Sequence, residues 1–103
     1  MNVKFNMLSK SQIKFLKSLS NTVENKYQVG KNEITDTLVD MLSKALDKYE
    51  LIKVCVNQSV KELKNEFANN LKASLHAEVV QIIGGVIVLY RKNLREPKIK
   101  LPK

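Results

Sequence analysis

Apolar residues recur with a helical period in three parts of the chain. The first part is residues 9–22, which open with the serine and glutamine spacing of a capping box. The second is residues 36–49, which follow a threonine cap and carry apolar side chains at i, i+3, i+4 and i+7. A second capping box at Ser59 begins the third. These patterns predict three amphipathic helices, each with one buried face.

Four short runs of strand-forming residues lie between and after these helices, at 26–29, 50–56, 78–83 and 86–91. Gly84 and Gly85 join the last two runs as a tight hairpin, because both residues accept a positive φ. Helical crossovers make the first three strands mostly parallel, and the hairpin makes the fourth antiparallel to the third. The sequence therefore predicts an α/β fold in the order helix-strand-helix-strand-helix-strand-strand, with one mixed four-stranded sheet. The order of the strands within the sheet stays open.

Length and composition indicate a single compact domain. The chain has 103 residues, of which 44% are hydrophobic, which is enough for one core. We expect a domain over residues 1–93 and a basic tail over residues 94–103, extended or partly disordered because of its two prolines. The only cysteine, Cys55, excludes an internal disulfide and is expected to be buried in a strand. No apolar run is long enough to span a bilayer, so a soluble cytoplasmic protein is predicted.

The formal charge of +8 is concentrated at the two ends of the chain. Residues 1–31 carry six lysines and one glutamate, and residues 91–103 carry six basic residues and one glutamate, a net charge of +5 in each case. Residues 32–90 carry six lysines and eight acids, a net charge of −2. If the fold brings the first helix, the turn at Gly30 and the tail onto one side, they form a surface for a polyanion such as RNA. If it does not, the charge only makes the protein soluble.

Two segments are candidate phosphate contacts. Lys10, Lys14 and Lys17 form a stripe on the first helix, away from its apolar face, although an ordinary solvated face has the same pattern. Gly30 and Lys31 lie in a turn between a strand and a helix. Glycine there permits close backbone approach, and the lysine and the following helix N-terminus favour an anion.

Residues for catalysis are nearly absent from the sequence. His76 is the only histidine and is interpreted as a turn or capping residue at the end of the third helix. Glu62 and Glu66 lie one helical turn apart but are flanked by lysines, so a solvated face explains them better than a metal site. The turn at Gly30 has neither the spaced glycines nor the Ser/Thr of a P-loop. We therefore predict that the protein is not an enzyme and has no metal or cofactor.

Several segments, in this order, resemble one known family. They are QVGK at residues 28–31, ELIKV at 50–54, VQIIG at 80–84, IVLYR at 87–91 and IKLP at 99–102, preceded by a first helix with Leu8, Gln12 and residues 16–19 in matching places. Together they resemble the CRM-domain RNA-binding proteins of the bacterial YhbY type over almost the whole chain.

The resemblance implies a fold similar to the C-terminal domain of the third bacterial translation initiation factor. It also implies a function: single-domain members associate with precursors of the large ribosomal subunit, so ribosomal RNA is the expected partner. In this family the loop after the first strand is a GxxG turn that clamps a nucleic-acid backbone. Here Gly30 matches the first glycine, Lys31 and Asn32 match the variable pair, and Glu33 stands in place of the second glycine.

Two RNA-binding mechanisms remain open. Either the turn contacts phosphates through Gly30, Lys31 and Asn32, with Glu33 rotated outward or paired with a lysine, or binding depends on basic residues elsewhere. Those residues are Lys10, Lys14, Lys17, Arg91, Lys92 and Arg95, with Lys53 added if its side chain lies on an exposed face of the sheet. The six aromatic residues give little support to base stacking, with Tyr27 the best candidate. A protein-binding adaptor with basic tethers is the alternative function, and we expect a monomer in either case.

Overall fold

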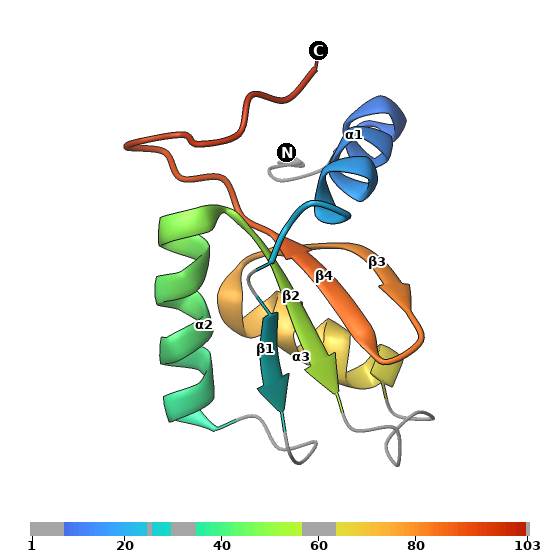
Figure 1. Cartoon of the computed structure of the whole chain (residues 1–103). Coiled ribbons are helices and arrows are strands. Elements are labelled where there is room, and N and C mark those ends of the chain that lie inside the picture. Colours follow the sequence, from blue (N-terminus) through green and yellow to red (C-terminus); the bar gives the residue numbers. More distant parts are fainter. Residues whose placement is uncertain (1–7, 25, 30–34, 57–63, 103) are drawn as a thin grey trace, which may run out of the picture.

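The structure has the element order that the hydrophobic pattern predicts. A computed structural model describes residues 8–24, 26–29, 35–56 and 64–102 of the chain. Its helices and strands are α1 (Lys10–Ser20), β1 (Lys26–Val29), α2 (Asp36–Tyr49), β2 (Leu51–Val56), α3 (Lys64–Leu75), β3 (Glu78–Ile83) and β4 (Val86–Tyr90). The predicted α/β domain with one mixed four-stranded sheet is confirmed (Figure 1).

Two of the predicted helix starts are confirmed. The hydroxyl of Ser9 accepts the N–H of Gln12 at 3.2 Å, and the side-chain oxygen of Gln12 accepts the N–H of Ser9 at 3.0 Å, which completes the capping box of α1. α1 ends at Ser20, two residues before the predicted end. α2 has the predicted bounds, with Thr35 as its cap. The capping box predicted at Ser59 lies outside the described residues.

The sheet order is β1-β2-β4-β3. β1 is parallel to β2, and β4 is antiparallel to both of its neighbours, β2 and β3. The first three strands therefore run in one direction, as predicted, but β4 separates β2 from β3. The most apolar strand takes this inner place, because four of the five residues of β4 are buried.

The two glycines of the β3–β4 hairpin have different roles. Gly84 has a φ of 57°, so it uses the conformational freedom that the sequence predicts. Gly85 is needed for close approach, because a Cβ atom there would lie 3.0 Å from the carbonyl oxygen of Val56. The carbonyl of Gly85 in turn accepts the N–H of Val56 at 2.7 Å, which ties the hairpin to the end of β2.

Two apolar clusters cover the two faces of the sheet. The larger cluster lies between one face and helices α2 and α3, and includes Leu42, Leu46 and Leu71. The smaller cluster lies on the other face, which we call the α1 face, where Leu16 of α1 packs against residues of β2, β3 and β4. In Figure 1, α1 lies over the upper end of this face only, and the helix that crosses the lower parts of the strands, α3, lies behind them on the other face.

The C-terminal segment is folded back onto the domain by a buried carboxylate. Glu50 is completely buried directly after α2, in a left-handed conformation with a φ of 66°. Its two carboxylate oxygens accept the backbone N–H groups of Asn93 at 2.5 Å, Lys98 at 2.7 Å and Ile99 at 2.6 Å. Residues 93–102 have no helix or strand, as expected for an extended tail. They are nevertheless held against the domain, because a buried carboxylate requires donors.

Glu50 was expected to begin a strand, and this prediction is wrong by one residue. Its N–H donates to the carbonyl of Leu46, which makes it the last residue of the helical turn, and β2 starts at Leu51. Its own carbonyl accepts the N–H of Arg91 at 2.9 Å, which extends the pairing with β4 by one hydrogen bond.

The Glu50→Ala substitution should lower the free energy of unfolding by about 3 kcal/mol, because it leaves three partly buried N–H groups without their charged acceptor. Urea denaturation followed by circular dichroism measures this change. Glu96→Ala is the matched control, since its exposed carboxylate pairs only with the ammonium of Lys98 at 3.4 Å. A loss equal to that of the control would show that the tail is not anchored by Glu50.

Candidate nucleic-acid interface

Three lysines on α1 form an exposed basic stripe. Lys10, Lys14 and Lys17 are all exposed, while Leu16 on the opposite side of the helix is fully buried. Among the described residues, none of the three ammonium groups has a carboxylate within ion-pair distance. The predicted α1 lysine stripe is therefore present on the surface, and its charge is available to an anion.

The tail brings the second basic end of the chain to the first. Gln12 of α1 donates its side-chain N–H to the carbonyl of Pro102 at 3.0 Å, a contact across ninety positions of sequence. Ile99 and Leu101 pack into the same apolar cluster as Leu16. The basic residues between them, Lys98 and Lys100, are exposed. The first helix and the tail therefore lie together, which is what a single basic surface requires of these two segments.

A cavity of about 580 Å³ lies between α1 and the tail. Tyr90 lines it, and the hydroxyl of this residue has no hydrogen-bond partner among the described residues. Burial, and secondly the charge of Glu50, raises the pKa of Tyr90 to about 12, so the hydroxyl keeps its proton at neutral pH. The rest of the lining is mostly apolar or basic and comes from Gln12, Lys92, Pro97, Lys98, Ile99, Lys100, Leu101 and Pro102.

Arg91 was predicted to bind RNA, but the structure gives it intramolecular partners. Its guanidinium donates to the carbonyl of Leu75 at 2.8 Å, to the carbonyl and hydroxyl of Ser43 at 2.7 and 3.1 Å, and to the carboxylate of Asp47 at 2.8 Å. Only 20% of the side chain is exposed. Arg91 therefore links β4 to both α2 and α3, and few of its donors remain for a phosphate.

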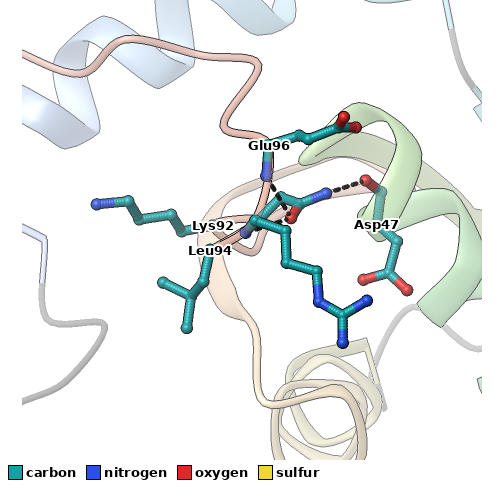
Figure 2. Close-up of a pocket in the computed structure, with 6 residues that line it drawn as sticks. Asp47, Lys92, Leu94 and Glu96 are labelled. Atoms are coloured by element: carbon teal, nitrogen blue, oxygen red, sulfur yellow. Dashed lines mark hydrogen bonds between the residues drawn. The ribbon is translucent and has the colours of Figure 1, made fainter.

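The neighbouring residues Lys92 and Arg95 line a second cavity of about 920 Å³, together with Asp47, Asn93, Leu94 and Glu96. The Asn93 side chain holds residues 93–96 against the end of α2, because it donates to the carbonyl of Asp47 and accepts the N–H groups of Arg95 and Glu96. Two acids and two bases line the cavity, so its interior does not favour a polyanion. In Figure 2, however, the Lys92 side chain extends away from the carboxylates of Asp47 and Glu96.

Lys53 lies on the α1 face of β2, next to Lys26 of β1 in the register of the sheet. Lys53 is half-buried and Lys26 is exposed. Lys53 joins the predicted binding residues only if its side chain lies on an accessible face of the sheet, and it does. The turn residues Gly30, Lys31 and Asn32, and the adjacent Glu33, lie outside the described residues, so their RNA-binding role stays a prediction.

Lys26, Lys98 and Lys100 were not among the predicted site residues. The signal for the last two is the alternation of Lys98, Ile99, Lys100 and Leu101, which is typical of a segment with one face on an apolar surface.

His76 has a φ of 54° directly after α3, which confirms that it is a turn residue. The described part of the chain contains no group of three or more His, Cys, Asp or Glu residues placed to hold a metal ion. None of its helices has the length and apolar character needed to cross a membrane.

These features define a class of protein, a small α/β domain with an exposed basic helix and a basic tail beside it. Residues 8–91 match the model of the CRS1/YhbY (CRM) domain family, and the chain belongs to this family. It is 38% identical over 96 residues to the probable RNA-binding protein YqeI of Bacillus subtilis, covering 93% of this chain and 100% of that protein. It is 36% identical over 96 residues to an RNA-binding protein of Haemophilus influenzae, covering 93% and 96% of the two chains.

The fold is also that of a solved relative. The solution structure of the hypothetical protein SAV1595 from Staphylococcus aureus, a candidate RNA-binding protein, superimposes with a TM-score of 0.78 at 35% identity. The match covers 93% of this chain and all of that one. The family and the fold expected from the sequence resemblance are therefore confirmed, and the two relatives named above carry names that describe RNA binding.

Arg91 and Lys92 make a matched pair for separating structure from binding. Arg91→Ala should lower the free energy of unfolding by about 2 kcal/mol, because it removes hydrogen bonds to α2 and α3. Lys92→Ala should change stability by less than about 0.5 kcal/mol, since its side chain is exposed, and should weaken RNA binding. Urea denaturation and fluorescence anisotropy with labelled RNA measure the two effects. A stable Arg91→Ala variant with weakened binding would instead assign Arg91 to the interface.

Proposed function

We propose that this protein binds ribosomal RNA in precursors of the large ribosomal subunit and assists ribosome assembly in the cytoplasm. The observation that carries the proposal is the packing of the basic tail against α1, the helix that carries the lysine stripe, through the contact of Gln12 with Pro102. A basic helix and a basic tail are in contact in this way, in a chain whose relatives are named RNA-binding proteins. Ribosomal RNA and the large subunit come from the family resemblance, and the experiments below test them.

The proposed binding mode is mainly electrostatic. Lysine ammonium groups on α1 and the tail neutralise phosphates, and the released counterions supply much of the binding free energy. Most aromatic side chains of the described residues lie in or against the apolar clusters, so they are not free to stack on bases. Phe15, with 38% of its surface exposed on α1, is the exception. Because few aromatic side chains are available for stacking, recognition of RNA shape and backbone fits this surface better than recognition of a long base sequence.

The turn at Gly30, Lys31 and Asn32 is a second proposed contact, as half of a GxxG clamp. It directly follows Val29, the buried last residue of β1, and precedes the cap of α2 at Thr35. The helix N-terminus of α2 favours phosphate at this end of the sheet. A contact here and one on α1 would lie on different parts of the molecule, so their contributions can be separated by substitution.

RNA binding should weaken steeply with salt and depend on the α1 lysine stripe. With about five phosphates neutralised, log K should fall against log[salt] with a slope of roughly −3.5 for single-stranded RNA. Lys14→Glu with Lys17→Glu should reduce affinity at least about 25-fold at 0.1 M salt, for all RNA sequences alike. Lys44→Glu with Lys48→Glu, on the exposed surface of α2, makes the same change in net charge and is the control. A flat salt response, or equal losses in both variants, would contradict a site on α1.

Glu33→Gly tests the turn independently. This substitution restores the second glycine and removes a negative charge, so affinity for RNA should rise several-fold if the turn contacts the backbone. Anisotropy titrations at fixed salt measure the change, and Lys31→Glu should reduce affinity if the same contact exists. An unchanged affinity in both variants would leave α1 and the tail as the binding surface.

Ribosomal particles distinguish RNA binding from the adaptor function. Tight, salt-sensitive binding to protein-free ribosomal RNA supports the proposal. Co-sedimentation with precursor particles, without any binding to the stripped RNA, would mean that a ribosomal protein is the partner. Crosslinking in cells followed by sequencing of the bound RNA then shows whether large-subunit ribosomal RNA is the target.

A further inference from the structure

Part of the α1 face of the sheet is not covered by α1 or the tail. The upper end is covered by α1 and the tail, where Leu51, Val80 and Tyr90 are buried. Further along the strands, the side chains on the same face are exposed or half-buried. We call this part the open sheet face, and it consists of Lys26, Gln28, Lys53, Cys55, Gln81, Ile83 and Val86.

Two lysines lie side by side on the open sheet face. Lys26 and Lys53 are Cα partners in the parallel β1–β2 ladder, so their side chains leave the same face about 4.8 Å apart at the backbone. Like charges directly opposite each other in a sheet are destabilising. Among the described residues neither lysine has an ion pair. The only acid on the four strands, Glu78, lies opposite Tyr90 at the covered end. An anion placed between the two lysines would remove this repulsion.

A shallow groove begins at Lys53 and runs toward the β3–β4 hairpin. Its volume is about 170 Å³, well below the roughly 300 Å³ at which pockets for drug-sized ligands begin. The apolar part comes from Val86 and from Ile83, which is 60% exposed. The polar part includes the side-chain amides of Asn21 and Gln81, neither of which has a hydrogen-bond partner in the described part of the chain.

This combination fits one nucleotide of a single-stranded RNA. A nucleobase has two apolar faces and an edge of donors and acceptors, which match the aliphatic wall and the free amides. Its phosphate carries the negative charge that the lysine pair lacks. A duplex does not fit, because its bases are stacked inside the helix and cannot enter a groove on a sheet.

We propose that the open sheet face binds one unpaired nucleotide, with its phosphate at Lys26 and Lys53 and its base in the groove beside Gln81 and Ile83. This inference rests on the proposed RNA-binding function and adds a subsite to it. It assigns selectivity for single strands to the sheet, whereas the α1 lysine stripe and the tail attract phosphates of any RNA. The subsite is distinct from the turn at Gly30, because every residue in it belongs to the described strands or to the end of α1.

The lysine pair is tested with Lys26→Ala and Lys53→Ala combined. Affinity for a short mixed-sequence single-stranded RNA should fall about 25-fold at 0.1 M salt, and the salt slope should become shallower by roughly 1.4, the value for two lost contacts. Affinity for the duplex of the same sequence should change no more than in Lys48→Ala, a control on exposed α2. Thermal unfolding should show an unchanged or higher midpoint, because a repulsion is removed.

The base groove is tested with a matched RNA in which the bases are missing. The wild-type protein should prefer the RNA with bases, and Ile83→Ala should reduce this preference about fourfold, the effect of losing roughly one buried methylene of contact. Nuclear magnetic resonance should show shifts of the Asn21 and Gln81 side-chain amides and of the Ile83 methyl groups when the RNA with bases is added. Ile83 is exposed, so its substitution leaves the fold intact.

Each of four outcomes would overturn the inference. Resonance shifts confined to α1 and the tail, or equal effects of the lysine pair and of Lys48→Ala, would show that RNA does not use the sheet, while the proposed function would stand. Equal affinity of the wild-type protein for RNA with and without bases would show that no base binds in the groove. A wild-type protein that binds none of these RNAs would overturn both the subsite and the proposed function.

Discussion

The buried carboxylate of Glu50 is the interaction on which the arrangement of this molecule depends. It lies where α2 ends and β2 begins, with no connecting loop, and it binds three backbone N–H groups of the tail. Hydrogen bonds to a charged group are each worth roughly 1.5–3 kcal/mol, more than ordinary ones. An uncompensated buried charge is so unfavourable that the tail cannot leave without exposing Glu50 to solvent or leaving it unpaired. A single side chain therefore couples the helix-to-strand turn to the position of the C-terminal segment.

The position of the tail in turn determines the surface. Because the carboxylate holds Lys98 and Ile99, the following residues reach α1, where Leu101 packs beside Leu16 and Pro102 accepts the hydrogen bond from Gln12. The exposed lysines of the tail then lie on a segment that packs against the helix carrying the α1 lysine stripe. The buried carboxylate of Glu50 thus holds the basic tail against the basic helix α1.

Local signals made most of the fold predictable. The capping box of Ser9 and the apolar period of α2 specify helices through contacts within four residues, so sequence reading locates them well. The strand order was not predictable, because the insertion of β4 between β2 and β3 depends on pairing between distant segments. Glu50 was missed as a turn residue for a similar reason. Its left-handed backbone is compensated by tail residues more than forty positions away, and no local pattern reports them.

The candidate site was predictable in part. Exposure of the α1 lysines follows from the helical period alone, since their apolar counterparts must face the core. Arg91 could not be separated from Lys92 by sequence, because both are basic residues after a strand. Their difference arises from packing: Arg91 lies within reach of two helices, whereas Lys92 extends into solvent. The pairing of Lys26 with Lys53 follows from the strand register, which the sequence left open.

The acids of the molecule complete the electrostatic argument. α2 carries Asp36, Asp40 and Asp47 on its exposed surface and packs on the face of the sheet opposite to α1. These three acids therefore lie on the opposite side of the sheet from the α1 lysine stripe, in a molecule whose radius of gyration of 13.2 Å is longer than the Debye length of about 8 Å at physiological salt. A polyanion approaching the basic side is only weakly affected by the acids behind the sheet. On the proposed function, the field of these basic residues would orient an approaching RNA toward α1, the tail and the open sheet face before contact.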